Sequence, residues 1–356
     1  MGKQLRVGII GTGSISHMHI TSYEKNENAE IIALCDIDEK RLKTAADKYG
    51  IEKTYADYRR MFAECALDAV SVCTWNSQHA PCAIAALEAG LHVLCEKPMA
   101  INRAEAETMR EAAERSGKLL MIGFVRRFGN DCRVLKDFIN NGDLGEIYYA
   151  KTTYIRRFGC PGGWYGDKAR SGGGPLIDLG VHVIDLTRYL MGNPKPVSVY
   201  AAAFDKLLAN KSVKDAKGYR SATKSNNNPA DVEDMVSALV RYDNGAVLNI
   251  VTSFALNVKE DEGLIELMGT KGGAKLNPNL EIFTEKNGYM VNIGFNTPTA
   301  LSFNGLFENE VNHFVDCALN GSPCLAPAGD GVVVMRIIDA IYESAQTKRE
   351  VVINNN

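Results

Sequence analysis

The chain has 356 residues, of which 46% are apolar and 23% are charged, and its formal net charge at pH 7 is −3. This length exceeds one ordinary hydrophobic core and predicts two domains, placed at residues 1–123 and 124–356. The small net charge gives no indication of nucleic acid or an anionic membrane as a partner.

The nine cysteines are an odd number, and no two of them have C-x-x-C spacing. Several lie inside apolar, strand-like runs, where cysteine acts as a small hydrophobic residue. This usage favours a reducing compartment without a disulfide framework or a metal site. The chain enters a strand near residue 5, so no signal peptide is expected, and no apolar run is long enough to span a bilayer. We therefore expect a cytoplasmic protein.

The first elements follow the order of a dinucleotide-binding unit. A strand at 5–10 leads into a turn with Gly11 and Gly13, then a helix at 17–24 and a strand at 31–35 that ends at Asp36. Gly11 suits the tight turn, and Gly13 lets a pyrophosphate approach the helix N-terminus. Ser16 replaces the usual third glycine or alanine, so the fingerprint is incomplete. The alternative is an ordinary glycine-rich turn followed by an unrelated aspartate.

Asp36 also bears on the choice of cofactor. A carboxylate at this position accepts hydrogen bonds from ribose hydroxyls and repels a 2′-phosphate. Asp38 adds a second negative charge, and the nearest cation, Arg41, is interpreted as a helix-surface residue. The pattern favours NAD over NADP.

Strands and helices keep alternating until residue 122, which predicts a parallel, doubly wound α/β sheet. One strand, 91–95, runs into Glu96 and Lys97 and is stopped by Pro98. A lysine at the carboxyl end of such a strand lies where open α/β sheets bind ligands. The alternative is a surface lysine just past a strand. The helices expected here are 39–49, 58–64, 80–89 and 103–116, and the further strands are 69–73 and 119–122.

For the remaining two-thirds of the chain, the sequence pattern predicts mostly strands with a few helices. A loop at 156–173, rich in glycine and aromatic residues, is either a mobile cover or a packed surface loop, and some of its residues could touch substrate. The polar stretch 205–231 is interpreted as a long surface excursion, and residues 243–245 as a hairpin turn. Strands are expected at 146–155, 197–204, 236–242, 246–256, 264–268 and 280–284, helices at 134–141, 308–319 and 330–346, and a short tail at 351–356.

An amphipathic helix is predicted for residues 176–191, with Pro175 in its first turn. Asp178 and His182 are four residues apart and therefore share a helix face, and Asp185 lies near that face. A carboxylate beside an imidazole can fix its tautomer and raise its basicity, as a general base requires. A buried structural pair and a metal site are the alternatives, but no third metal ligand stands out.

Several motifs together resemble the glucose–fructose oxidoreductase / inositol dehydrogenase / rhizopine-catabolism family (Gfo/Idh/MocA). The resemblance covers nearly the whole chain. It departs from the usual pattern at Ser16 and at Trp75, where the family usually has proline. The matching segments are 8–13, Asp36, 74–80, 89–98, 126–128, 172–182, 232–234 and 267–273.

The resemblance implies a nicotinamide cofactor, polyol or sugar substrates, and a C-terminal domain with a large, mostly antiparallel open sheet that often serves oligomerisation. For His79, a place at a helix start without a ligand role is the alternative. Together, the residue patterns and the resemblance give these predictions: the catalytic residues are Lys97, His182 and Asp178; the cofactor-binding residues are Gly11, Gly13, Ser14, Ile15, Asp36, Thr74, Trp75, Asn76, His79, Glu96 and Lys97; and the substrate contacts are Arg127, Tyr154, Trp164, Asp178 and His182.

The resulting hypothesis is an NAD-dependent oxidoreductase in which His182 takes a proton from a secondary hydroxyl of a sugar or cyclitol while a hydride passes to NAD. Asp178 orients His182 or binds a neighbouring hydroxyl, and Lys97 stabilises the developing alkoxide. The hypothesis requires Lys97 and His182 to meet at one nicotinamide. Two alternatives stay open: a redox-neutral sugar enzyme with tightly held NAD, such as an epimerase, a sugar–sugar oxidoreductase or an eliminating glycosidase, and a non-catalytic sensor of NAD or sugar. We expect a homodimer or homotetramer.

Overall fold

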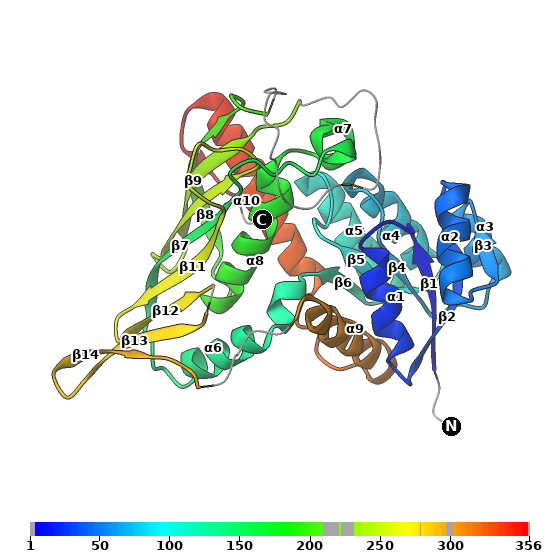
Figure 1. Cartoon of the computed structure of the whole chain (residues 1–356), viewed down its shortest axis with the longest axis horizontal. Coiled ribbons are helices and arrows are strands. Elements are labelled where there is room, and N and C mark those ends of the chain that lie inside the picture. The colour runs from blue at the N-terminus through cyan, green and yellow to red at the C-terminus, as the bar shows by residue number, and fades with distance from the viewer. Residues whose placement is uncertain (1–3, 209–220, 222–230, 278, 297–301, 355–356) are drawn as a thin grey trace. The chain divides into compact units, whose positions relative to one another are not determined.

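A computed structural model describes residues 4–208, 221, 231–277, 279–296 and 302–354 (Figure 1). The chain forms two compact units. Unit 1 comprises Met1–Val125 and Ser302–Val332, and unit 2 comprises Arg126–Leu301 and Val333–Asn356. The sequence predicted one boundary, between residues 123 and 124. In the structure the chain also comes back to unit 1 at 302–332. Each unit is described by itself below.

Unit 1 is built on a six-stranded parallel sheet with the order β3-β2-β1-β4-β5-β6. The predicted doubly wound sheet is thereby confirmed. Its central strands are continuous apolar runs because both faces are covered, and Val7, Val70 and Val93 have no exposed surface. The strands are β1 (Leu5–Ile10), β2 (Ala29–Cys35), β3 (Lys53–Tyr55), β4 (Ala69–Val72), β5 (His92–Glu96) and β6 (Leu120–Gly123). The three-residue β3 is absent from the sequence prediction.

The order of the strands reverses between β1 and β4, and this is the place where open α/β sheets bind ligands. The turn after β1 touches the end of β4 there. Gly11 has φ +88°, and a Cβ added to it would lie 2.6 Å from the carbonyl oxygen of Cys73. Only glycine fits this close approach, which brings the glycine turn to the carboxyl edge of the sheet.

The helices of unit 1 begin and end close to the predicted limits, except that α9 begins five residues before the predicted start at residue 308. They are α1 (Ser16–Glu24), α2 (Glu39–Tyr49), α3 (Tyr58–Glu64), α4 (His79–Glu88), α5 (Arg103–Ser116) and α9 (Phe303–Asn320). Asn102 accepts a hydrogen bond from the Glu105 N–H at the start of α5, and Gly117 ends that helix with φ +64°. Helix α9 comes from the distant part of the chain and packs against α1, while α4 packs against α5 (Figure 1).

Unit 2 is built on a nine-stranded sheet with the order β14-β13-β12-β11-β7-β10-β9-β8-β15. Its pairs are antiparallel except for β10 beside β7, so the predicted large, mostly antiparallel sheet is confirmed. The strands are β7 (Ile147–Ile155), β8 (Pro196–Phe204), β9 (Met235–Tyr242), β10 (Val247–Ser253), β11 (Glu262–Gly269), β12 (Gly272–Leu276), β13 (Glu281–Lys286), β14 (Tyr289–Ile293) and β15 (Val351–Val352). The helices in this unit are α6 (Asn130–Asn140), α7 (Lys168–Ser171) and α8 (Val181–Leu190), and α10 (Ala328–Thr347) crosses from unit 1 into unit 2.

Three sequence predictions for unit 2 need correction. Residues 351–352 are not tail but strand β15, which pairs with β8. Strands β12 and β14 were not predicted: β12 begins with two glycines, and the five-residue β14 shows no regular alternation of apolar and polar residues. The predicted α-helix at 176–191 begins instead as a π-helical turn, Leu176–Gly180, before α8. The predicted excursion at 205–231 lies mostly outside the described residues.

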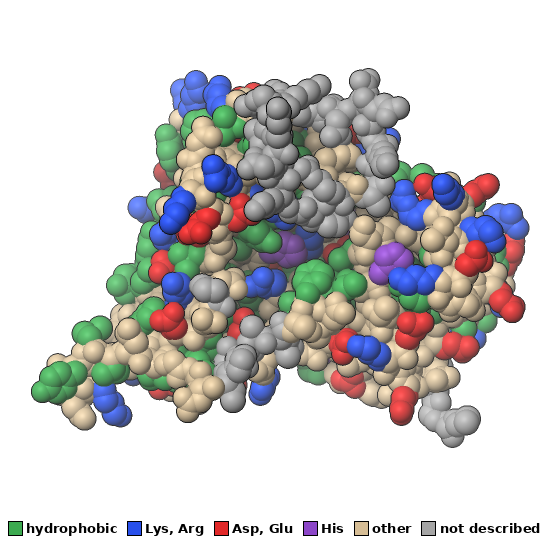
Figure 2. Space-filling view, in the orientation of Figure 1, with side chains coloured by type: hydrophobic (Ala, Val, Ile, Leu, Met, Phe, Trp, Pro, Cys, Tyr) green, Lys and Arg blue, Asp and Glu red, His purple; other side chains and the backbone are tan. Residues whose placement is uncertain are grey.

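Apolar side chains are exposed at the tip of the β13–β14 hairpin, at the end of the sheet (Figure 2). Tyr289 and Met290 on β14 are the most exposed of them. Among the helices that the structure describes, none has both the length and the apolar character that a membrane crossing requires.

Candidate functional site

The glycine turn of unit 1 leaves open space in front of the N-terminus of α1. A Cβ built on Gly13 would meet no atom within 4 Å. Ile15, the residue that precedes α1, makes no side-chain cap hydrogen bond, and the first turn carries no acidic residue. Unsatisfied N–H groups at a helix N-terminus bind phosphate oxygens, so the turn fits the pyrophosphate of a dinucleotide.

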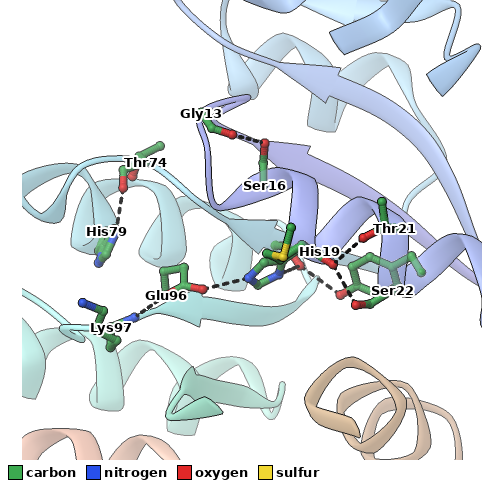
Figure 3. Close-up of polar contacts among 12 residues, drawn as sticks. Gly13, Ser16, His19, Thr21, Ser22, Thr74, His79, Glu96 and Lys97 are labelled. Atoms are coloured by element: carbon green, nitrogen blue, oxygen red, sulfur yellow. Dashed lines mark hydrogen bonds and ion pairs between the residues drawn. The ribbon is translucent and has the colours of Figure 1, made fainter. Parts of the chain in front are cut away.

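Ser16, the departure from the glycine fingerprint, is accommodated without crowding this space. Its side chain is buried, and its hydroxyl donates a hydrogen bond of 2.7 Å to the carbonyl oxygen of Gly13. The serine therefore stabilises the turn that a smaller residue usually forms (Figure 3).

Asp36 follows β2 and holds the glycine turn. Its Oδ2 accepts hydrogen bonds from the backbone N–H of Thr12 at 2.7 Å and from the Thr12 hydroxyl at 3.0 Å. Its Oδ1 accepts one from the N–H of Asp38 at 2.8 Å. Arg41 lies nearby, with Nη1 3.9 Å from Oδ2 of Asp36 and Nη2 3.2 Å from Asp38. Arg41, interpreted from the sequence as a helix-surface residue, thus lies beside both carboxylates.

Lys97 follows β5 at the carboxyl edge of the same sheet, and its main chain is held by Glu96. Oε2 of Glu96 accepts a hydrogen bond from the Lys97 N–H at 3.1 Å, and Oε1 lies 2.9 Å from Nε2 of His19 on α1 (Figure 3). Nδ1 of His19 lies 3.3 Å from the hydroxyl of Ser71. Because Glu96 and His19 are buried, this chain of contacts fixes the backbone of the predicted catalytic lysine.

Glu310 on α9 brings a second carboxyl group to this cluster. Ligand atoms of His19, Glu96 and Glu310 all lie within 4.8 Å of one another. Glu310 has no exposed surface, and neither of its carboxyl oxygens has a hydrogen-bond partner among the described residues. Burial raises the pKa of Glu310 well above its usual range, and the charge of Glu96 adds to the effect. Burial without a hydrogen-bond partner disfavours the charged form of this carboxyl group.

His79 joins two segments of the carboxyl edge. Its Nδ1 lies 2.7 Å from the carbonyl oxygen of Pro98. Its Nε2 lies 3.2 Å from the carbonyl oxygen of Thr74 (Figure 3). The ring is buried, and burial lowers its pKa. Trp75 and the buried Asn76 follow Thr74 directly, so His79 sets the path of the main chain that carries these predicted cofactor contacts.

In unit 2 the π-helical turn Leu176–Gly180 carries Asp178, and His182 lies in the first turn of α8. The start of this turn is held by Glu233. Oε2 of Glu233 accepts a hydrogen bond from the N–H of Gly174 at 2.9 Å, and Oε1 accepts one from Leu176 at 3.2 Å. A carboxylate at a helix N-terminus is favourable because it meets the free N–H groups there.

Tyr342 on α10 completes this support. Its hydroxyl donates to Oε1 of Glu233 at 3.0 Å. A Cβ on Gly173 would lie 2.0 Å from that hydroxyl oxygen, and a Cβ on Gly174 would lie 2.2 Å from the carbonyl oxygen of Glu233. The two glycines are therefore needed for the close packing that places Asp178.

Arg127, predicted to contact substrate, forms a buried ion pair with Asp185 of α8. Nε of Arg127 lies 3.0 Å from Oδ2, and Nη2 lies 2.5 Å from Oδ1. The guanidinium also lies over the ring of Tyr189, 4.6 Å from its centroid. The pair ties the segment at Arg127 to the helix that carries His182, while substrate contact by Arg127 stays a prediction.

The loop at 156–173 has local structure and side-chain contacts of its own. Within it, Gly163–Gly166 form a 3₁₀ turn, and the Lys168 N–H donates to Asp231 at 2.8 Å. The ring of Trp164 stacks on that of Tyr165 with centroids 3.9 Å apart. The ring of Tyr154 on β7 lies beneath the guanidinium of Arg156, 5.8 Å from its centroid. Substrate contact by Trp164 and Tyr154 stays a prediction.

The sequence did not predict the supporting roles of five residues. Asp185 was placed near the face of Asp178 and His182, and Glu233 lies in a segment that matches the family, but neither was expected to hold the site. Glu310 gives only a weak signal, a carboxylate among the apolar positions of an amphipathic helix. His19 and Tyr342 lie far along the chain from the groups that they hold, and no local pattern connects them.

Two family descriptions match this chain. "Oxidoreductase family, NAD-binding Rossmann fold" matches residues 5–124, and "Oxidoreductase family, C-terminal alpha/beta domain" matches residues 136–353. D-glucoside 3-dehydrogenase of Escherichia coli (strain K12) is 34% identical over 346 residues, which cover 96% of each chain. Myo-inositol 2-dehydrogenase of Thermotoga maritima is 27% identical over 355 residues, which cover 98% of each chain.

The chain is also similar to solved structures of oxidoreductases. Levoglucosan dehydrogenase in complex with NADH has a TM-score of 0.85 and 25% sequence identity, covering 99% of this chain and 100% of that one. Aldose-aldose oxidoreductase from Caulobacter crescentus, complexed with glycerol, has a TM-score of 0.82 and 26% identity with the same coverage. The chain is therefore an oxidoreductase, and it belongs to the Gfo/Idh/MocA family.

Proposed function

We propose that this protein transfers a hydride between a secondary hydroxyl of a sugar or cyclitol and NAD. The observation that carries the proposal is the position of Lys97, which follows β5 at the carboxyl edge of the parallel sheet and is held there through Glu96 and His19. A cation fixed at this edge can stabilise an alkoxide that forms beside a bound dinucleotide. The names of the relatives, which include dehydrogenases of a glucoside and of inositol, support the substrate class.

The residues of unit 1 fit a dinucleotide. The open space at Gly13 and the uncapped start of α1 would hold the pyrophosphate, and Asp36 would bind the adenosine ribose. The exposed Ile37 would cover one face of the adenine. We favour NAD because a 2′-phosphate would meet the carboxylate of Asp36, although Arg41 beside it offers a compensating charge.

When bound, the nicotinamide accepts the hydride from the carbinol carbon. In the proposed reaction His182 takes the hydroxyl proton as the general base, and Asp178 orients His182 or binds a neighbouring hydroxyl. Lys97 stabilises the negative charge that develops on the substrate oxygen. The carbinol thus loses a proton and a hydride and becomes a carbonyl. Asp185 and Arg127 hold the helix that carries His182 in place.

The second candidate is a redox-neutral enzyme that holds NAD through turnover. The similarity to an aldose-aldose oxidoreductase supports it, since such an enzyme returns the hydride to a second sugar. A non-catalytic sensor is the weaker alternative, because Lys97, Asp178 and His182 are all present.

The deciding experiment is a screen of inositols, hexoses, uronates and glycosides, with NAD added, for the absorbance of NADH. Net formation of NADH with one class supports the dehydrogenase. NAD that stays bound through purification, without net NADH formation, supports the redox-neutral enzyme. Failure of both tests with a protein that binds NAD supports the sensor.

We also propose that the sheet of unit 2 forms a homodimer or homotetramer. Tyr200 on β8 and Leu239 on β9 are direct neighbours across the strands and are 57% and 36% exposed. Large apolar side chains in contact on an open sheet face are typical of a surface that another chain covers. Free thiols at all nine cysteines support a cytoplasmic location.

A further inference from the structure

Three potential metal ligands meet at the end of α9, far along the chain from the residues of the proposed reaction. His313 and Cys317 are four residues apart and therefore lie on one face of this helix. Gly321 ends α9 with φ +70°, and the chain turns back so that Cys324 reaches the same place. One ligand atom from each residue lies within 4.8 Å of the other two.

We propose that His313, Cys317 and Cys324 form a zinc site. Thiolate and imidazole groups are preferred ligands of Zn²⁺, and three of them leave a fourth tetrahedral position for water. Zn–S bonds of about 2.3 Å and Zn–N bonds of about 2.0 Å place tetrahedral ligand atoms roughly 3.5–3.8 Å apart. The distance of 3.3 Å between Sγ of Cys317 and Nε2 of His313 is close to this range.

The histidine already presents the nitrogen that the ion needs. The backbone N–H of Leu325 donates to Nε2 of His313 at 3.0 Å, so this nitrogen carries a lone pair and the ring proton lies on Nδ1. An ion at Nε2 would replace this amide, which can then donate to a thiolate sulfur. Binding of one Zn²⁺ releases the two thiol protons to solvent, which balances the charge of the two new thiolates.

The neighbouring chain indicates what the ion would do. Cys324 opens a short segment that runs along β6, the edge strand of the unit 1 sheet. The Ile122 N–H donates to the carbonyl oxygen of Ala326 at 2.9 Å, and Met121 forms a bridge with Pro327. An ion that joins Cys324 to α9 would fasten this segment over an otherwise open strand edge. The ion would hold this segment in place, so the proposal is independent of the substrate.

The spacing alone does not reveal the site. The cysteine pattern predicts no metal site, because no cysteine pair has C-x-x-C spacing. Here a histidine and a cysteine one helical turn apart are joined by a cysteine that arrives from the following loop.

The test uses the full chain, reduced and freed of metal with a chelator, and titrated with Co²⁺ and then Zn²⁺. We expect one ion per chain, a cobalt–thiolate charge-transfer band that Zn²⁺ abolishes, and a higher unfolding temperature with Zn²⁺. The Cys324→Ser and His313→Asn variants should bind at least about 100-fold more weakly, since loss of even an outer partner of a ligand can cost that much. In both variants Zn²⁺ should no longer raise the unfolding temperature. Only Cys324→Ser should weaken the cobalt–thiolate band of the Co²⁺ that still binds, because it removes a thiolate ligand.

Cys160→Ser is the matched control, because Cys160 is another part-exposed thiol and lies outside the cluster. It should keep full affinity and the full thermal shift. The proposal is overturned if Cys324→Ser binds Zn²⁺ as tightly as the parent chain. It is also overturned if the reduced parent chain, with its thiols verified by titration, gives no cobalt–thiolate band, or if Cys317 and Cys324 stay joined as a disulfide under reducing conditions.

Discussion

Nε2 of His19 lies 2.9 Å from Oε1 of Glu96, and the other oxygen of this carboxylate receives the N–H of Lys97. The histidine lies on α1, directly after the glycine turn, and the glutamate ends β5. One carboxylate therefore joins the proposed nucleotide-binding helix to the backbone of the proposed catalytic lysine. Movement of one element is expected to disturb the other, because the group that connects them is buried.

Replacing Lys97 with methionine tests the mechanism. The variant should bind NAD nearly as well as the parent chain, while kcat falls about 10²–10³-fold or more, because the developing alkoxide loses its cation. Methionine keeps most of the length of the side chain, so packing is little changed. NAD binding is measured by calorimetry and turnover by NADH formation with the substrate found in the screen.

Lys43→Met is the control for this experiment. Lys43 is an exposed lysine of α2 that lies near Asp47. Removing its charge should leave kcat unchanged. Near-parental turnover in Lys97→Met would remove Lys97 from the mechanism.

Much of unit 1 follows from the sequence because its information is local. The apolar runs of the strands, the glycine turn and the caps of the helices each act within a few residues, and the limits predicted for α2, α3 and α5 agree with the structure. The turn at Gly11 is a good example, since its positive φ and its contact with Cys73 both require glycine. Local chemistry thus determines this half of the fold.

The support of the site could not be predicted because it depends on long-range contacts. Glu310 meets Glu96, and Tyr342 meets Glu233, across more than a hundred residues of sequence. The π-helical start before α8 is equally hidden from the sequence, and the two glycines just before it pack closely against Tyr342 of α10 and against Glu233, both distant along the chain. Such contacts appear only once the sheets are assembled.

Glu310→Gln should stabilise the protein at neutral and alkaline pH. Burial raises the pKa of Glu310, so the folded protein keeps the proton that the unfolded chain loses above its ordinary pKa of about 4.3. The stability contributed by the protonated group is full below that pH and decreases as the pH rises toward the folded-state pKa. The loss is at most about 1.4 kcal/mol per pH unit. Glutamine is neutral throughout and removes this dependence.

Urea unfolding at several pH values between 4 and 8, roughly the range in which this linkage operates, measures the effect. The free energy of unfolding of the glutamine variant, relative to that of the parent chain, should increase with pH.

The groups that face Glu310 are His19 and Tyr23 on α1, Glu96 on β5 and Cys73 after β4. Glu308→Gln on the same helix is the control, and it should show little pH dependence because Glu308 forms only a surface pair with Lys25. Parallel pH curves for Glu310→Gln and the parent chain would contradict a raised pKa of Glu310 in the folded protein.

Tyr342→Phe should loosen the turn that carries Asp178. The substitution removes the hydrogen bond to Glu233 and should lower the free energy of unfolding by about 1–3 kcal/mol, since a part-buried carboxyl group loses a donor. If Asp178 acts as proposed, kcat falls while the affinity for NAD is kept. Denaturant titration, calorimetry and turnover measure the three quantities. Tyr289→Phe, on the exposed β14, is the matched control and should change none of them.

Tyr200→Glu combined with Leu239→Glu should separate the subunits of the proposed oligomer. The two residues face each other across β8 and β9, so the variant places two like charges where an apolar contact is proposed. Sedimentation velocity should show smaller species at concentrations where the parent chain is assembled. Thr44→Glu on α2 adds the same kind of charge in unit 1 and should leave assembly unchanged. A parent chain that sediments as a monomer would end the proposal.

Asp36→Ser should shift the cofactor preference from NAD toward NADP. The carboxylate that would repel a 2′-phosphate is removed, and Arg41, with Nη1 now 3.9 Å from Oδ2 of Asp36, is left to pair with that phosphate. The ratio of kcat/KM for NADP to that for NAD should rise at least about tenfold, which corresponds to about 1.4 kcal/mol.

Adding Arg41→Ala to Asp36→Ser should cancel the gain in kcat/KM with NADP without restoring kcat/KM with NAD. Asp36→Asn removes the charge but keeps an oxygen for the Thr12 N–H, so it separates repulsion from a collapse of the glycine turn. An unchanged ratio in all three variants would show that Asp36 does not bind at the ribose.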